Sequence, residues 1–199
     1  MIFETIITTV NLVGKPHITP FGVKYDGDLV FISPYKPSTT LDNILATKTA
    51  TLNITDDVRV FAGALTNNNS HIKLAPLQAS NFQTNGHAGY RLANALSHSE
   101  LALIEVKDDA ERPQLIMQKI HSETHAPFLG FNRAQAAVVE LSILVSRLRM
   151  LPREKIEAEL AYLQIAIDKT TGKRELEAWG WLIDEIKDFY AGSTKWRNC

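Results

Sequence analysis

The stretch HITPFGVKYDGDLVFIS, residues 17–33, decides the fold expected for the N-terminal half of the chain. It contains two runs of β-branched and aromatic residues separated by Asp26-Gly27, a strong hairpin signal. A further strand-like run, residues 2–13, precedes it and ends at the turn formed by residues 14–16. Three consecutive strands joined by short turns indicate an antiparallel meander rather than the β-α-β units of a parallel sheet.

Strand signals continue after this meander, with one short helix between them. Leu41, Ile44 and Leu45 have helical spacing, and residues 49–55 form the next apolar run. A helical or turn segment is expected at residues 56–64, and an irregular excursion at residues 66–98 with a short helix near residues 90–95. Two last strands, 101–107 and 115–122, flank a polar turn. Six or so antiparallel strands favour a small β-barrel.

The C-terminal part of the chain has the periodicity of helices. Asn132 is expected to cap the first helix, with Gln135 at the capping-box position. Apolar stripes then predict three helices, packed as an antiparallel bundle on themselves or on the barrel. The expected organisation is therefore a mainly β domain at residues 1–130 and a helical extension packed on it at residues 131–199.

Composition limits the classes of partner. The net charge is −1, which gives no electrostatic reason to expect nucleic acid or an anionic membrane. No apolar run approaches the roughly 20 residues of a membrane span. The single cysteine, Cys199, allows neither a disulfide framework nor a thiolate metal site, so the cytoplasm is the expected compartment.

The candidate anion site lies at residues 33–40, SPYKPSTT. Three hydroxyl groups, those of Ser38, Thr39 and Thr40, stand where a helix begins, and Lys36 adds a positive charge beside them. Unpaired N–H groups at a helix start attract phosphate. The alternative is that these side chains only cap the helix, for example Thr39 with Asp42 or Thr40 with Asn43.

Three other places in the sequence leave a ligand role and a structural role open. Pro20 makes its strand an edge or a local irregularity, and Gly22 permits the close approach of a planar ligand or forms a β-bulge. Asn53 lies between apolar residues and needs partners, either a ligand or nearby backbone. Arg133 opposes the dipole of its helix and has either an anionic partner or a plain surface position.

No metal site is predicted. His121 and His125 share one face if they lie on a strand, but no third ligand occurs at a useful spacing. His98 and the other histidines show no grouping in the sequence. No catalytic acid, base or nucleophile can be named, because phosphate-loop, dinucleotide-binding and serine-hydrolase motifs are absent from the sequence.

Five blocks carry a family resemblance: GKPHITPFGV, FISPYKPSTTLDNI, TATLNITDDV, PFLGFNRAQAAVVE and RELEAW. In this order they resemble the FMN-binding split-barrel proteins of the domain of unknown function 447 family, and more loosely the flavin reductases. The resemblance extends from Ile2 to Trp179, and residues 66–98 match least well. Tyr35 stands where the family pattern has Phe, and either ring can pack beside a flavin.

The resemblance implies a split β-barrel that binds FMN near the interface of a homodimer. Residues 19–22 would line the flavin ring, residues 33–35 would flank it, and residues 38–43 would hold ribityl and phosphate oxygens. Asn53 would lie near the ring or the ribityl chain. The full candidate set is Thr19, Pro20, Phe21, Gly22, Ser33, Tyr35, Lys36, Ser38, Thr39, Thr40, Asn43, Asn53, Asn132 and Arg133.

Two functions are compatible with such a site. One is a flavin reductase-like oxidoreductase that passes hydride or electrons from NADH or NADPH to a small acceptor, with His17 or Asn53 as candidates for tuning the ring. The other is a non-catalytic FMN-binding module that acts as a carrier, storage protein or sensor. A weaker third possibility is a pyridoxal-phosphate or haem-related binder on the same barrel.

Overall fold

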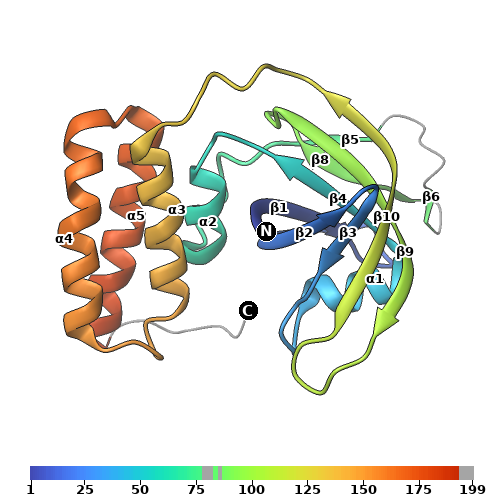
Figure 1. Cartoon of the computed structure of the whole chain (residues 1–199), viewed down its shortest axis with the longest axis horizontal. Coiled ribbons are helices and arrows are strands. Elements are labelled where there is room, and N and C mark those ends of the chain that lie inside the picture. The colour runs from blue at the N-terminus through green and yellow to red at the C-terminus, as the bar shows by residue number, and fades with distance from the viewer. Residues whose placement is uncertain (78–82, 85–86, 193–199) are drawn as a thin grey trace. The chain divides into compact units, whose positions relative to one another are not determined.

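The computed structural model describes residues 1–77, 83–84 and 87–192, and divides them into two units (Figure 1). The first unit comprises residues 1–55 and 72–127 and contains the strands. The second comprises residues 56–71 and 128–192 and contains four helices. The sequence range 1–130 placed residues 56–71 with the barrel, whereas in the structure they pack with the C-terminal helices.

Six antiparallel strands form a closed barrel in the first unit. They are β1 (Phe3–Val10), β2 (Pro16–Asp26), β3 (Leu29–Ile32), β4 (Thr49–Ile54), β9 (Ser97–Lys107) and β10 (Gln114–Thr124). Their order around the barrel is β1-β2-β3-β10-β9-β4, with β4 paired to β1. This confirms the predicted antiparallel barrel and its opening meander.

The barrel interior is filled by the apolar residues that alternate along each strand. Ile7, Val23 and Leu101 are fully buried there, and Leu41 and Ile44 of helix α1 (Thr39–Thr47) join the same cluster. Because successive side chains of a strand point to opposite faces, the residues between these core positions face outward. The period of two thus gives each barrel strand an inner apolar face and a second face that can carry polar groups.

The excursion between β4 and β9 contains short strands. In its described parts, β5 (Leu74–Pro76) pairs with β8 (Tyr90–Leu92), and β6 (Gln83–Thr84) pairs with β7 (His87–Ala88). The short helix expected near residues 90–95 is therefore wrong. Leu92 is fully buried and its N–H donates to the Asn53 side chain, so tertiary contacts hold this segment extended.

Helices α2 (Arg59–Thr66), α3 (Arg133–Ser146), α4 (Arg153–Thr170) and α5 (Lys173–Tyr190) form the second unit. Their apolar stripes meet in a core that includes Leu141, Ile156 and Leu182. Asn132 caps α3 as predicted, but the Gln135 amide donates to Glu175 of α5 rather than completing a capping box. No helix in the described part of the chain is long and apolar enough to cross a membrane.

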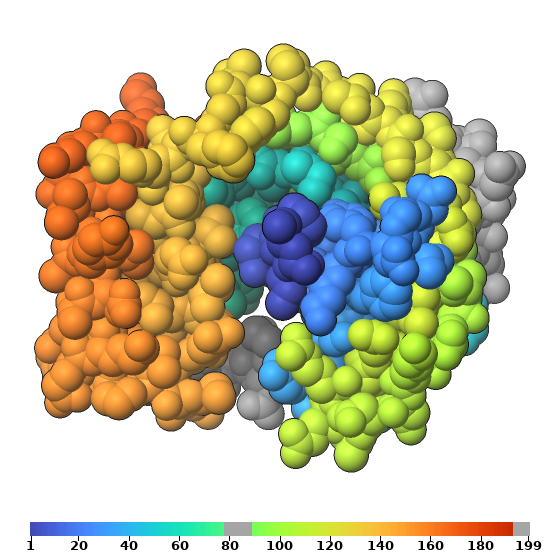
Figure 2. All heavy atoms as spheres, in the orientation of Figure 1, coloured from blue at the N-terminus to red at the C-terminus, as the bar shows by residue number. Residues whose placement is uncertain are grey.

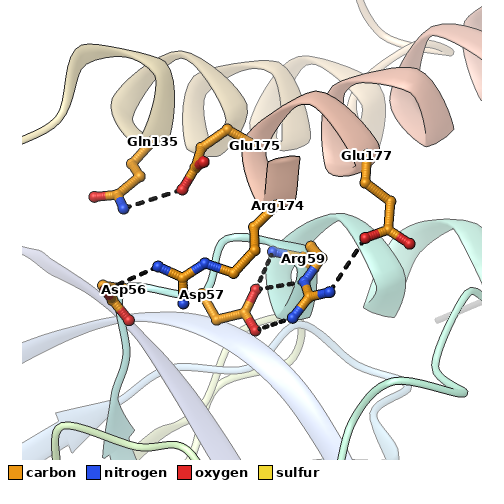
Figure 3. A network of polar contacts seen from close by, with 7 residues as sticks. All are labelled: Asp56, Asp57, Arg59, Gln135, Arg174, Glu175 and Glu177. Atoms are coloured by element: carbon orange, nitrogen blue, oxygen red, sulfur yellow. Dashed lines mark hydrogen bonds and ion pairs between the residues drawn. The ribbon is translucent and has the colours of Figure 1, made fainter. Parts of the chain in front are cut away.

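A network of ion pairs ties the segment before α2 to helix α5 (Figure 3). Arg59 donates to the Asp57 carboxylate through Nε at 2.9 Å and through an Nη at 2.7 Å, and reaches Glu177 at 3.1 Å. The neighbouring pair joins Arg174 to Asp56 at 3.2 Å. The Asp57 side chain is only 1% exposed, so its charge depends on Arg59.

Stability of the helical unit should therefore fall in acid. Burial alone would raise the pKa of the Asp57 carboxyl, but the hydrogen bonds and charge of Arg59 outweigh it and lower that pKa below its ordinary value of 3.8. A lowered folded-state pKa means that the contribution is complete above the unfolded pKa and is lost as the pH falls through the folded one. We expect the free energy of unfolding to decrease as the pH falls below about 4, the ordinary pKa of this carboxyl.

The Asp57→Asn variant should lower the free energy of unfolding at pH 7 by about 1.5–3 kcal/mol and remove part of this acid sensitivity. Asp56→Asn is the matched control, because its pair is more exposed and is expected to contribute below about 1 kcal/mol. Urea unfolding followed by tryptophan fluorescence reports this half, since Trp179 and Trp181 both lie on α5. Equal losses in the two variants would contradict the assignment.

Candidate functional site

The start of helix α1 is the centre of the candidate site. Ser38 has an extended backbone and is the N-cap, and its Oγ accepts from the Leu41 N–H at 3.3 Å. The capping alternative is therefore confirmed for Ser38, and is wrong for Thr39 and Thr40 as the N-cap. The N–H groups of Thr39 and Thr40 have no acceptor within the helix, because they lie in its first turn. The side chain of Thr39 is exposed at this opening, while that of Thr40 is buried.

A chain of hydroxyl contacts joins this helix start to β2. Thr40 Oγ1 donates to Thr19 Oγ1 at 3.4 Å, and Thr19 Oγ1 lies 2.6 Å from His17 Nε2. Burial lowers the pKa of His17, so its ring is neutral at pH 7. The structure thus brings together Ser38, Thr40 and Thr19 of the predicted set, with the suspected tuning residue His17 next to them.

Gly22 and Ser33 lie in a second place, a surface pocket of about 210 Å³. The other residues lining it are Ile2, Lys24, Phe31, Arg112 and Gln114. A side chain at position 22 would meet Ile2, since a Cβ there would lie 2.8 Å from its Cγ2. The missing side chain at Gly22 thus leaves room for the Ile2 side chain. Gly22 pairs with Glu4 in an unbroken register, so the β-bulge suggested from the sequence is wrong.

The hydroxyl contacts at the start of α1 and the pocket at Gly22 lie on opposite faces of β2. Thr19 shares its face with Phe21, which packs on the barrel core, whereas Pro20 and Gly22 are on the other face. β2 pairs with β1 along Pro16–Val23, but with β3 only at Lys24–Asp26. Pro20 therefore belongs to a stretch with one strand partner among the described residues, as predicted for an edge.

The loop that joins β3 to α1 is held by the turn between β9 and β10. Arg112 Nε donates to the Ser33 carbonyl at 3.0 Å, and its guanidinium lies 4.6 Å from the centre of the Tyr35 ring. Lys36 Nζ contacts Asp108 Oδ1 at 3.1 Å and the Asp109 carbonyl at 2.8 Å. Lys36 therefore has acidic and carbonyl partners of its own, which weakens its expected role as a rim charge.

Asn43 and Asn53 are buried, and each has hydrogen-bond partners within the first unit. Asn43 Nδ2 donates to Thr9 Oγ1 at 2.9 Å. Asn53 is fully buried; its Nδ2 donates to the Ile6 carbonyl and Thr8 Oγ1, and its Oδ1 accepts from the Leu92 N–H at 2.8 Å. For Asn53 the structure favours the second of the two roles left open by the sequence, that of binding neighbouring backbone.

Asn132 and Arg133 belong to the helical unit. Asn132 Oδ1 accepts from the N–H groups of Ala134 and Gln135, and its Nδ2 donates to the Thr170 carbonyl. These contacts account for its amide as a cap that also ties α3 to the end of α4. The side chain of Arg133 is exposed. Their predicted contact with a cofactor stays a prediction.

Lys24 and Arg112 are the charged residues of this region that sequence reasoning missed. Lys24 had a signal, since it follows Gly22 by two residues and shares its strand face. Arg112 had no such signal, because only the folded turn brings it to Ser33.

The sequence showed no grouping of His98 with other histidines, and the structure corrects this. The His98 ring lies 5.0 Å from that of His125 and 6.0 Å from that of His121. Burial, with the charges of His125 and Arg91, lowers the pKa of His98 to about 4.

Comparison with protein families gives two matches along the chain. Residues 3–126 match the N-terminal domain of the family described as protein of unknown function DUF447, and residues 132–184 match the C-terminal domain of that family. The chain belongs to the DUF447 family. This confirms the resemblance stated from the sequence blocks. A search of the curated proteins found no match.

Solved structures show the same fold. An FMN-bound DUF447 protein from Methanosarcina mazei is 18% identical, with a TM-score of 0.76 over 92% of this chain and 94% of that one. The 2-nitrobenzoate 2-nitroreductase of Pseudomonas fluorescens is 16% identical, with a TM-score of 0.51 over 61% of this chain and 64% of that one. At these identities the comparison establishes a shared split-barrel fold for this DUF447 protein.

Replacement of Asn53 tests its structural role. Asn53→Ala removes the acceptor of the Leu92 N–H and should lower the free energy of unfolding by about 2–4 kcal/mol, because a buried donor loses its partner. Thermal unfolding followed by circular dichroism measures this, and Asn69→Ala, on an exposed loop, is the control expected to change little. Wild-type stability in Asn53→Ala would show that its contacts do not support the barrel.

Proposed function

We propose that this DUF447 protein binds FMN and acts as a flavin reductase-like oxidoreductase, passing hydride or electrons between NADH or NADPH and a small acceptor. The observation that carries the proposal is the hydroxyl cluster at the start of α1, on a barrel shared with an FMN-bound relative over 92% of the chain. FMN supplies the redox chemistry, and the residues of the chain supply its position and surroundings.

The phosphate would bind at the first turn of α1. The unpaired N–H groups of Thr39 and Thr40 and the partial positive charge of the helix start favour an anion there. The exposed hydroxyl of Thr39 adds a further donor, and Thr19 supports the buried Thr40 from β2. Capping by Ser38 does not compete with this function, because its Oγ serves the N–H of Leu41, one residue further into the helix.

The flavin ring would lie across the exposed edge of β2. An elongated ligand anchored near Thr19 can reach the pocket at Gly22 and Ser33 by passing this edge, where Pro20 offers no N–H to a strand. Lys24 and Arg112 line that pocket and would favour negative charge on a ring bound there. His17, neutral and in contact with Thr19, would set the hydrogen bonding between ring and phosphate.

A homodimer belongs to the same proposal. The chain leaves apolar side chains exposed next to the pocket, with Ile2 59% and Phe3 44% exposed, and the surface at the start of β1 is visible in Figure 2. A second copy would cover these side chains and complete the groove for the ring. We also propose the cytoplasm as the compartment, where NADH and NADPH are present.

The non-catalytic alternative shares the binding site and differs only in turnover. None of the residues that line the pocket is acidic, but the Glu4 carboxylate lies beside Gly22, 3.3 Å from where a Cβ of that residue would be. Hydride transfer to a flavin does not require an acidic side chain, because the cofactor carries the chemistry. The reductase and the carrier are therefore separated by reactivity with a nicotinamide donor and not by the geometry of the site.

Removal of the two threonine hydroxyls tests the phosphate site. Thr39→Ala combined with Thr40→Ala should weaken FMN binding at least about tenfold, since a hydrogen bond to a charged group contributes roughly 1.5–3 kcal/mol. Quenching of FMN fluorescence on titration into apoprotein gives the dissociation constant. Thr124→Ala, exposed on β10, is the control and should bind as the wild type does. Unchanged affinity in the double variant would place the phosphate elsewhere.

Anaerobic addition of NADH or NADPH to the FMN-loaded protein tests the reductase. We expect the flavin absorbance near 450 nm to be bleached and to return when air is admitted, because bound FMN accepts hydride and oxygen reoxidises it. Dithionite serves as the control that the bound flavin is reducible. A protein that binds FMN but is bleached by dithionite alone would be the carrier, storage protein or sensor of the alternative hypothesis.

A further inference from the structure

Five side chains of metal-ligating types meet on the outer face of the β9–β10 hairpin. His98 and Glu100 lie two residues apart on β9. The next residue, Leu101, points to the opposite face of the strand and is buried in the barrel core. Strand pairing puts Glu123 opposite His98 and His121 opposite Glu100, and His125 follows just after β10. Residues two apart on a strand share a face, so all five side chains stand on the same side of the hairpin.

A β-bulge in β10 determines which face of the hairpin His121 lies on. Lys119 pairs with Leu101, and the next pair is His121 with Glu100, so Ile120 is left without a partner in the ladder. In a regular ladder Ile120 would pair with Glu100, and position 121 would pair with Ser99 on the face of Lys119 and Leu101. Bulges often re-aim a side chain at a functional position, and here the bulge turns His121 toward Glu100 and His98.

The β9 residues of the cluster, His98 and Glu100, are buried, and one oxygen of Glu100 lacks a hydrogen-bond partner. His98 and Glu100 are each only 3% exposed. Glu100 Oε2 is buried and has no hydrogen-bond partner among the residues that the structure describes, and Glu100 Oε1 lies 3.9 Å from His98 Nε2. A buried carboxylate oxygen without a donor or cation is costly, so this position favours a positively charged occupant.

Neither the cavity beside Glu100 nor the arginine that acts on His98 provides a positive charge for the Glu100 carboxylate. Glu100 also lines a small cavity with Thr8, Thr51 and Gly89, and its volume of about 10 Å³ holds one water molecule at most. Arg91 is the arginine whose charge acts on His98, and its Nη1 donates to the carbonyl groups of Leu92 and Ala93. A cation from solution would reach Glu100 through the exposed side of the cluster, where His121 lies.

We propose that His98, Glu100 and His121 bind a divalent transition-metal cation such as Zn²⁺. One ligand atom from each of the three residues lies within 4.8 Å of the others, so small side-chain rotations bring them to a common ion. Two imidazoles and a carboxylate are a ligand set that zinc accepts, with a fourth position left to solvent. The ion would offset the charge of Glu100 and cross-link β9 to β10.

His125 would act as the partner that orients a ligand. Its Nε2 lies 2.8 Å from His98 Nδ1, and the two rings are nearly parallel. A His98 that donates its Nδ1 proton to His125 presents the lone pair of Nε2 to Glu100, which is the usual way in which a second residue fixes the tautomer of a metal-bound histidine. A second trio, His98, Glu123 and His125, is also close enough to share an ion. We assign the ion to the first trio, because only that one contains the unpartnered buried oxygen.

Equilibrium dialysis of the full-length, untagged protein against Zn²⁺, after removal of metals with a chelator, tests this site. Metal measured by mass spectrometry is independent of flavin colour, so the result does not depend on FMN binding. We expect one Zn²⁺ per chain, and we expect Glu100→Gln and His121→Gln each to weaken binding at least about tenfold. Glu105→Gln, an exposed carboxylate further along β9, is the matched control and should bind as the wild type does.

Two further outcomes decide the assignment. Glu123→Gln should leave the affinity within about twofold, and a loss there with normal binding by Glu100→Gln would overturn the trio in favour of the second one. His121 is exposed, so His121→Gln keeps the test valid even if the buried Glu100→Gln variant does not fold. Absence of saturable Zn²⁺ binding, or wild-type affinity in His121→Gln, would show that the cluster is a hydrogen-bonded surface of the barrel and no metal site.

Discussion

Closure of the barrel depends on a short contact between its first and fourth strands. β1 and β4 pair at only three positions, Ile6–Asn53, Ile7–Leu52 and Thr8–Thr51. Asn53 strengthens this contact, because its amide donates to the Ile6 carbonyl and to Thr8 while its oxygen holds the Leu92 N–H of β8. One side chain therefore joins β1, β4 and β8 at the place where the barrel closes.

Both proposed sites follow from that closure. On β2, the inner-face position of Thr19 meets the start of α1, whose apolar residues fill the barrel. On β9, the outer-face positions of His98 and Glu100 stand directly beside Asn53 and Thr51 of β4. The hydroxyl groups of Thr19 and Thr40 and the side chains of His98 and Glu100 thus use opposite faces of the same closed sheet.

The sequence predicted the features that depend on local chemistry. The Asp26-Gly27 hairpin, the strand alternation and the cap at Asn132 are short-range signals, and all three are found in the structure. The helix expected near residues 90–95 failed because Asn53, far away in sequence, holds that segment extended. The packing of residues 56–71 with the C-terminal helices was also unpredictable, because Val58 and Ala62 are buried against helices more than 70 positions away in the sequence.

The cluster of His98, Glu100 and His121 was predictable from the sequence only in part. The strands on either side of the turn were predicted, and counting nine residues back from Lys107 and nine on from Gln114 pairs His98 with Glu123. The same count pairs Glu100 with His121, but only because two opposite register shifts in the hairpin compensate each other. A single bulge would have turned His121 to the other face. The third ligand sought from sequence spacing was therefore present on the neighbouring strand, and its position depends on bulges that no local pattern in the sequence reveals.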